Sequence, residues 1–190
     1  PATDSDPVWS PDGSRIAFSS NRGGSPNNIY VKDSSGAGNE ERLLQASASN
    51  RVADWSRDGK TLLYVATDPK TGNDLWVVPL EGDHKPAPFL VTPFSETQGQ
   101  FSPDGHWIAY WSDESSQGEI YVQPFPAGGG KFQVSSGGGA QPRWRRDGKE
   151  IFYISADGKL TAAAVGGEAK TFEVGAARAL FQMPPINLSR

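Results

Sequence analysis

The sequence predicts an all-β fold built from four similar units, and two observations support this. One motif occurs four times: an aromatic residue, a turn of the Ser-Pro-Asp-Gly type, and a second run rich in β-branched and aromatic residues. The copies are Val8–Phe18, Asp54–Tyr64, Gln100–Tyr110 and Arg143–Tyr153. They recur about every 45 residues, a period typical of arrays of small sheets. The 22 Gly and 15 Pro residues fit many short strands joined by tight turns, and no long amphipathic helix is visible.

The Asp-Gly pair of each copy is expected to form a hairpin turn. Proline presets φ at the second turn position, aspartate bonds to nearby backbone, and glycine accepts a positive φ. Arg57 and Arg146 replace the proline in copies two and four, which a type I turn tolerates. A residue needed once per unit is more simply a turn former than a metal ligand or an acid catalyst. The predicted structural turn residues are Asp12, Gly13, Asp58, Gly59, Asp104, Gly105, Asp147 and Gly148.

Each hairpin is followed by two more predicted strands. The third strands are expected at Asn28–Val31, Leu75–Val78, Glu119–Val122 and Lys159–Ala162. The fourth strands are expected at Arg42–Leu44, Pro88–Val91, Phe132–Val134 and Ala179–Phe181. Residues Glu168–Leu180 include helix formers, but Gly175 interrupts them and the repeat register favours a strand.

Four antiparallel strands per repeat describe a β-propeller blade. The prediction is therefore an all-β, four-bladed β-propeller segment over residues 1–182, followed by a connector at 183–190. The predicted blades cover residues 5–46, 50–92, 96–136 and 139–182.

One large aromatic residue per unit is expected to pack between neighbouring blades. These residues are Trp9, Trp55, Phe101 and Trp144. Four blades are few for a ring, so we expect an open arc or part of a larger propeller, with no sign of strand exchange between the first and last blades. The exposed faces of the end blades could be covered by more blades of a longer parent, which we favour, or by a second copy in a homodimer.

Composition and charge argue against several classes of function. The net charge of -4 gives no reason to expect nucleic-acid binding, and the basic cluster within Arg143–Lys149 is interpreted as a solvated turn. Without cysteine there is no disulfide framework, thiolate nucleophile or thiolate zinc site. There is no membrane-spanning run and no signal peptide, so no membrane contact is expected of this segment. The chain opens on Pro1 directly in the repeat pattern, as expected of a piece of a longer protein.

The runs Pro7–Phe18 and Asn28–Asp33 resemble the WD-like repeat of TolB-type β-propellers, and this resemblance extends over nearly the whole chain. A narrower likeness lies in Glu119–Pro126 and Gln141–Tyr153, which are similar to the C-terminal propeller of many bacterial serine/threonine protein kinases. This resemblance implies an extracytoplasmic or periplasmic sensing or docking module. The kinase motifs themselves are absent: there is no Gly-rich nucleotide loop, His-Arg-Asp or Asp-Phe-Gly.

Two other classes of protein are alternatives for the longer parent of this segment. TolB-type repeats also form the substrate-gating propeller of prolyl-oligopeptidase-like serine peptidases, and a TolB-like protein-interaction domain of the cell envelope is a further alternative.

No catalytic set is predicted. The chain lacks a Gly-x-Ser-x-Gly elbow, and its two imidazoles, His84 and His106, are expected to be exposed and inert without an orienting partner and a nucleophile. Ser102–Trp107 resembles the Asp box of propeller glycosidases only superficially, and no carboxylate pair stands out. Asp4–Asp6 and Asp113–Glu114 lack the length and glycine placement of a calcium loop. We therefore expect no enzyme, metal site or cofactor in this segment.

The expected ligand is a protein or peptide, bound where the first strands of the blades begin, at the mouth of a central channel. Residues three or four positions before the repeated aromatic are polar in most copies and vary between copies, which suggests that they are not needed merely to build a blade. The candidate ligand-binding residues are Asp6, Arg51, Gln98 and Gln141. The alternative is that they are ordinary solvent-facing residues at the starts of strands.

Overall fold

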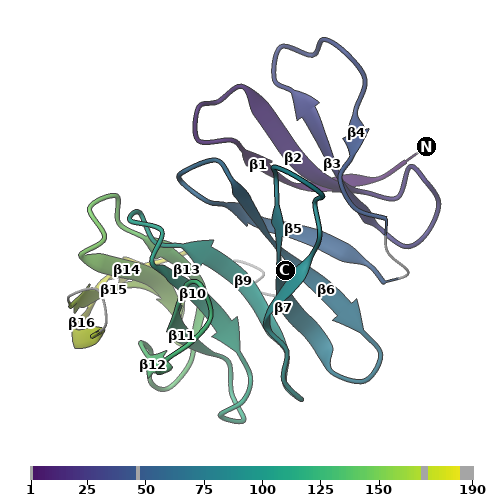
Figure 1. The fold of residues 1–190 in the computed structure, drawn as a ribbon. Coiled ribbons are helices and arrows are strands. Elements are labelled where there is room, and N and C mark those ends of the chain that lie inside the picture. Colours follow the sequence, from purple (N-terminus) through teal and green to yellow (C-terminus); the bar gives the residue numbers. More distant parts are fainter. Residues whose placement is uncertain (1, 46–47, 168–170, 185–190) are drawn as a thin grey trace. The chain divides into compact units, whose positions relative to one another are not determined.

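The structure is a computed structural model that describes residues 2–45, 48–167 and 171–184 of the chain. These residues form four sheets (Figure 1). The first sheet contains β1 (Asp4–Trp9), β2 (Arg15–Ser20), β3 (Asn28–Asp33) and β4 (Glu41–Arg42). The second contains β5 (Asn50–Trp55), β6 (Thr61–Asp68), β7 (Gly72–Pro79) and β8 (Ala87–Leu90). The third contains β9 (Glu96–Phe101), β10 (Trp107–Ser112), β11 (Glu119–Pro124) and β12 (Phe132–Gln133). The fourth contains β13 (Gly139–Trp144), β14 (Glu150–Ser155), β15 (Lys159–Gly166) and β16 (Glu173–Gln182).

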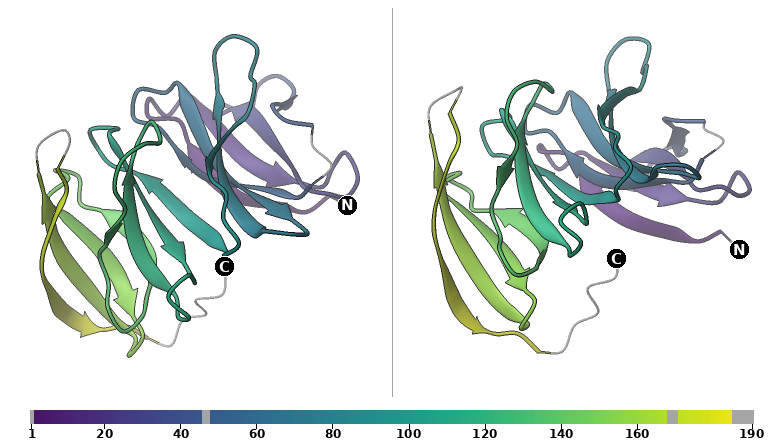
Figure 2. Two further views of the ribbon diagram at one scale, coloured as in Figure 1. Left: turned by 60° about the horizontal axis from the view of Figure 1, so that its bottom comes forward. Right: turned by 90° about the horizontal axis from the view of Figure 1, so that it is seen from below.

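Each sheet is a meander of four strands that are consecutive in the chain. Neighbouring strands run antiparallel, as where Ile16 of β2 pairs with Lys32 of β3. Figure 2 shows the strands of each sheet side by side, with β16 at the edge of the fourth sheet. The predicted all-β fold with four four-stranded units is confirmed, and among the described residues no strand is exchanged between sheets.

The Asp-Gly turn of the first copy is held by its own side chains. The Gly13 N–H donates to the Ser10 carbonyl (2.9 Å), and Asp12 Oδ1 accepts from Ser10 Oγ (2.6 Å) and from the Ser14 N–H (3.0 Å). Ser10 Oγ also accepts from the Arg15 N–H (2.8 Å), which ties the turn to β2. The serine hydroxyl and the Ser14 N–H lower the pKa of Asp12 to about 2.

The other three turns have the same backbone conformation, and the turn glycines of all four copies have φ between +72° and +74°. In the fourth copy Arg145 replaces the serine, and its Nε donates to Asp147 Oδ1 (2.7 Å) while its Nη1 donates to Glu150 Oε2 (2.6 Å). The Arg145 guanidinium, with the Lys149 N–H, holds the pKa of Asp147 well below its ordinary value. A guanidinium thus replaces the hydroxyl as the donor to the turn carboxylate.

The chain divides into two compact units, residues 1–97 and 98–190. In the first unit the β1–β4 and β5–β8 sheets share one core. Its buried members are Ala17, Ile29, Val31, Leu44, Val52, Trp55, Leu62, Tyr64 and Val78. In the second unit the two later sheets share another. Its buried members are Trp107, Ala109, Ile120, Val122, Val134, Ile151, Tyr153, Ala163, Val165 and Phe172. Largely the same repeat positions therefore form the interface between the two sheets of each unit. We call this interface the joint.

The fourth strands depart most from the prediction. β4 ends at Arg42, whereas the predicted strand continued to Leu44; Leu44 is nevertheless buried in the core of the first unit. β16 begins at Glu173, well before the predicted start at Ala179, because its first residues also pair with β15. Of the predicted connector, residues 185–190 lie outside the described part of the chain.

The four repeated aromatic residues are not equally buried. Trp55 and Phe101 are 3% and 5% exposed, and Trp144 is half-buried. Trp9 is 58% exposed, so the expectation that it packs between blades is wrong for this position. The physical reason is that nothing in the described part of the chain covers the face on which Trp9 lies.

Candidate functional site

Three of the four predicted ligand-binding residues have a left-handed backbone conformation. The φ angles are +51° at Asp6, +57° at Gln98 and +55° at Gln141. In β1 the register shifts between Ser5 and Val8, and in β13 it shifts at the corresponding place. Each shift is a β-bulge, in which two residues of one strand oppose a single residue of the next.

The second copy is built differently at this position. Its equivalent residue, Val52, pairs regularly with Tyr64, and the register shift falls after it, before Asp54. A β-branched side chain disfavours the left-handed conformation. The residue type at this position therefore varies between copies because the backbone conformation varies: polar residues stand where φ is positive, and valine stands where the strand pairs regularly.

The side chains of the predicted site fall into two groups. In the second unit the Gln141 N–H donates to Gln98 Oε1 (2.6 Å), so the structure brings these two residues together. In the first unit Asp6 Oδ2 accepts from Ser5 Oγ (2.8 Å), and no hydrogen bond or ion pair joins Asp6 to Arg51. Arg51 is half-buried, and its guanidinium has no hydrogen-bond or ion-pair partner among the described residues.

In the first unit the joint between sheets is closed. The Trp55 indole is 3% exposed, and its Nε1 donates to the Gly59 carbonyl of its own turn (3.1 Å). The Arg15 guanidinium of the preceding sheet lies 5.2 Å from the centre of the Trp55 ring, within the range of a cation–π contact. The tryptophan is covered by its own sheet and by the neighbouring one.

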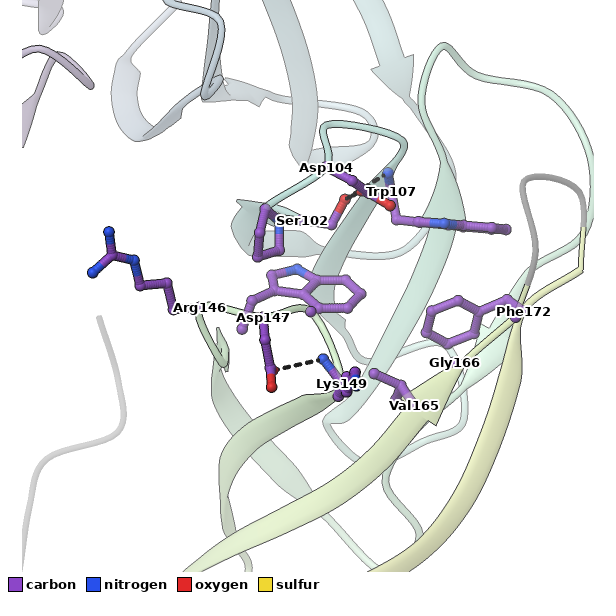
Figure 3. Close-up of a pocket in the computed structure, with 13 residues that line it drawn as sticks. Ser102, Asp104, Trp107, Arg146, Asp147, Lys149, Val165, Gly166 and Phe172 are labelled. Carbon is purple, nitrogen blue, oxygen red and sulfur yellow. Dashed lines mark hydrogen bonds between the residues drawn. The ribbon is translucent and has the colours of Figure 1, made fainter.

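In the second unit the equivalent joint is open. Trp144 stands at the Trp55 position but is half-buried, and its Nε1 donates to the Gln100 carbonyl of the preceding sheet (3.2 Å). Trp107 replaces Arg15 and packs on Phe172, with ring centres 4.9 Å apart. A cavity of about 540 Å³ lies at this joint (Figure 3). It is lined by Ser102, Pro103, Asp104, Trp107, Trp144, Arg146, Asp147, Gly148, Lys149, Val165, Gly166, Gly167 and Phe172.

The cavity has an aromatic floor and a charged rim. The Trp144 ring meets the Phe172 ring edge-on, with centres 6.2 Å apart. On the rim, Asp147 is bound by Arg145, whereas Lys149 and Arg146 have no side-chain hydrogen bond or ion pair with any described residue. Figure 3 shows the Arg146 side chain pointing away from the aromatic rings, although both Arg146 and Lys149 belong to the lining.

Sequence reasoning assigned Trp144 only to packing and did not find this cavity. Two departures from the repeat could have indicated the cavity. Trp107 stands where the other copies have Arg15, Thr61 and Glu150, and Arg145 stands where the other copies have serine. Both departures fall at the joint that is open.

The imidazoles lie apart from the cavity lining. One ring nitrogen of His84, Nδ1, lies 3.0 Å from the Pro79 carbonyl oxygen, and His106 is exposed without a side-chain partner among the described residues. The buried Glu119 binds backbone and side chains: it accepts from the Gly138 N–H (2.8 Å), from Gln117 Nε2 (2.9 Å) and from the Ser135 hydroxyl. Residues 2–45, 48–167 and 171–184 contain no group of three or more His, Cys, Asp or Glu side chains that could hold a metal ion.

Comparison with solved structures places the four sheets in a known architecture. The chain superposes on a protein assigned as TolB from Agrobacterium tumefaciens with a TM-score of 0.74 and 19% identity, covering 90% of this chain and 64% of that one. For TolB from Acinetobacter baumannii the TM-score is 0.70, the identity 20% and the coverage 90% and 43%. For a puromycin-hydrolyzing peptidase from Mycobacterium tuberculosis the values are 0.70, 17%, 95% and 31%.

The four sheets are β-propeller blades. The likeness concerns the fold, and no protein-family model matches the chain. The propeller segment spans less than two thirds of the length of each of these three proteins. The described part of the propeller segment holds no helix with the length and apolar character needed to cross a bilayer.

Proposed function

We propose that this propeller segment is a non-catalytic binding module, and that the cavity beside Trp144 receives an apolar or aromatic side chain of a protein or peptide partner. One observation carries the proposal. The same joint is closed over Trp55 in the first unit and open beside Trp144 in the second. A blade can thus be built with the joint closed, so the open joint is not a requirement of the fold.

The size and chemistry of the cavity suit this role. Ligand pockets are typically about 300–1,000 Å³, apolar for the most part, with a few polar groups that fix orientation. The cavity of about 540 Å³ combines the Trp144, Trp107 and Phe172 rings with the Lys149 ammonium, which has no side-chain hydrogen bond or ion pair with the residues that the structure describes. Aromatic side chains anchor many protein–protein contacts because they bury a large area with few rotatable bonds.

The proposed setting is the extracytoplasmic or periplasmic part of a bacterial serine/threonine kinase, where the propeller would bind a ligand or protein partner. The resemblance of Glu119–Pro126 and Gln141–Tyr153 to kinase propellers supports it. The alternatives are the gating propeller of a prolyl-oligopeptidase-like peptidase, which the fold likeness to a peptidase favours, and a TolB-like envelope domain. The parent gene separates the first two: an upstream kinase domain with a membrane span supports the kinase, and a downstream α/β-hydrolase domain supports the peptidase.

Peptide display tests the binding role. A random peptide library is selected on the wild-type chain, and the enriched peptides are assayed against three variants. We expect the enriched peptides to share an apolar or aromatic residue and to lose binding to Trp144→Ala. Lys149→Glu should also weaken binding, because it reverses a charge on the rim of the cavity.

The matched control is Phe94→Ala, which removes an exposed aromatic ring of the first unit and should leave binding unchanged. No enrichment, or enriched peptides that bind all three variants equally, would overturn the proposal. Hydrolysis of peptide, ester or glycoside substrates above background would overturn its non-catalytic part.

A further inference from the structure

The turn of the fourth sheet that borders the Trp144 cavity is basic. It contains the cations Arg145, Arg146 and Lys149 and a single carboxylate, Asp147. The chain as a whole has a net charge of -4, so this turn is a cationic patch on an acidic protein. Arg146 and Lys149 belong to the lining of the cavity (Figure 3).

Arg145 and a second arginine pair with the carboxylates that follow in and after this turn. Arg145 Nε donates to Asp147 Oδ1 (2.7 Å), and Arg145 Nη1 donates to Glu150 Oε2 (2.6 Å). Glu150 Oε1 pairs with Arg178 Nη2 at 2.8 Å. Bonds between guanidinium and carboxylate groups are among the stronger hydrogen bonds of proteins. Asp147 and Glu150 therefore have charged partners without the ammonium of Lys149.

The second copy of the repeat shows the alternative arrangement. Its turn carboxylate, Asp58, accepts from the uncharged Ser56 hydroxyl (2.6 Å) and from the Lys60 N–H (3.0 Å). Lys60 stands at the repeat position of Lys149 and is likewise exposed, but the joint in its unit is closed over Trp55. A lysine at this position is thus compatible with both joints, and only in the second unit does it border the cavity.

The polar groups of the lining differ in what they can still bind. The other carboxylate of the lining, Asp104, accepts at Oδ1 from the Ser102 hydroxyl and from the His106 N–H (3.0 Å), within its own turn. Lys149 and Arg146 have no side-chain hydrogen bond or ion pair with any residue that the structure describes. In Figure 3 Arg146 points away from the aromatic rings. Lys149 is therefore the lining cation best able to bind an acceptor on a ligand whose ring occupies the cavity.

We propose that the residue received by the Trp144 cavity lies next to a carboxylate of the same partner, and that Lys149 binds this carboxylate. This inference rests on the proposed function and names the chemistry of its ligand. The carboxylate is either an Asp or Glu side chain beside the apolar residue, or the C-terminus of a chain that ends in that residue. Lys149 is exposed, so the pair contributes up to about a five-fold gain in affinity and mainly selects among ligands.

Two pairs of probes test the inference by NMR titration of the Trp144 indole N–H signal, which Trp144→Phe assigns. N-acetyl-phenylalanine and its amide differ in the terminal carboxylate. Acetyl-Asp-Phe-Asp-amide and acetyl-Asn-Phe-Asn-amide have the same shape and differ in side-chain charge. Near neutral pH we expect the charged member of at least one pair to bind about three-fold more tightly than the neutral member. The pair that shows this preference identifies the source of the carboxylate.

Salt and two variants test whether the preference comes from Lys149. Raising the salt from about 0.1 M to about 1 M shortens the screening length from about 10 Å to about 3 Å and should reduce the preference. Lys149→Gln should abolish it. Lys60→Gln makes the same change at the same repeat position in the unit with the closed joint, and should retain it. The remaining amide signals confirm that both variants keep the wild-type fold.

The outcomes separate this inference from the proposed function. Neutral probes that bind at Trp144 while neither charged probe is preferred would overturn the inference and leave the proposed function standing. Probes that all fail to shift the Trp144 signal would overturn both. A preference that survives Lys149→Gln, or that Lys60→Gln also removes, would show that Lys149 is not the group that binds the carboxylate.

Discussion

The Gln141 N–H donates a 2.6 Å hydrogen bond to Gln98 Oε1, which links the bulge of β13 to the start of β9 in the preceding sheet. Both residues have positive φ, so the side chain of one strained residue accepts a hydrogen bond from the backbone N–H of the other. The polar residue at the start of the first strand therefore has a structural partner in the second unit.

Gln98→Ala should lower the free energy of unfolding by about 1 kcal/mol, the usual loss for one hydrogen bond. Gln98→Glu keeps an acceptor at this place and should remain close to the wild type. Urea denaturation near neutral pH measures both. If both variants are equally destabilised, or neither is, the hydrogen bond does not stabilise the joint.

Gln141→Val should destabilise the fourth sheet because φ at this residue is +55°. The left-handed conformation costs a residue with a Cβ roughly 1–2 kcal/mol, and a β-branched residue more, so we expect a loss of at least about 1 kcal/mol. Gln141→Gly, which has no such penalty, should not destabilise the protein. Thermal unfolding compares the two, and a valine variant as stable as the glycine variant would contradict this account of the bulge.

Asp12→Asn should remove a pH-dependent part of the stability. The Ser10 hydroxyl and the Ser14 N–H lower the pKa of Asp12 to about 2 in the folded chain, from about 4 in an unfolded one. A carboxyl with a depressed pKa stabilises the fold above its unfolded pKa, and this contribution is lost as pH falls through the folded pKa. The stability difference between wild type and variant should therefore be full above about pH 4 and shrink towards pH 2. Urea titrations across this range measure it, and a difference that stays constant with pH would contradict the assignment.

Trp55→Ala should cost about 3–5 kcal/mol, since the indole is buried and its removal leaves a cavity in the core of the first unit. Trp9→Ala changes the same residue type at the equivalent position, where the ring is exposed. It should cost less than about 1 kcal/mol when measured at dilution where the wild type is monomeric. Equal losses would mean that the two positions are not differently packed.

The sequence predicts most of the fold because its signals are local and repeated. The Asp-Gly turns determine the hairpins through their positive-φ glycine and, in the first three copies, a serine hydroxyl such as that of Ser10. The runs of β-branched and aromatic residues after the turns predict the second and third strands. The weak fourth strands are predicted less well: β16 extends back to Glu173 because pairing with β15, a tertiary contact, overrides the local helix preference of that stretch.

The candidate site is harder to predict, because it depends on which positions are covered. Trp9, Trp55 and Trp144 occupy the same position of the repeat, yet Trp9 is exposed, Trp55 is covered by Arg15 and Trp144 borders a cavity. The bulge could have been suspected from Asp6-Pro7 and Gln141-Pro142, whereas the second copy has a β-branched Val52. Its left-handed backbone, however, is visible only in the structure.

The most direct test of the central claim, an open joint at Trp144 and a closed one at Trp55, is an NMR titration of the indole N–H signals. The chain has 6 tryptophans, and Trp144→Phe and Trp55→Phe assign the two signals that matter. The probe is N-acetyl-phenylalanine amide, whose size allows a dissociation constant on the order of 1 mM. We predict a saturable shift of the Trp144 signal and none of the Trp55 signal. No saturable shift at Trp144, or equal shifts at both residues, would contradict the account.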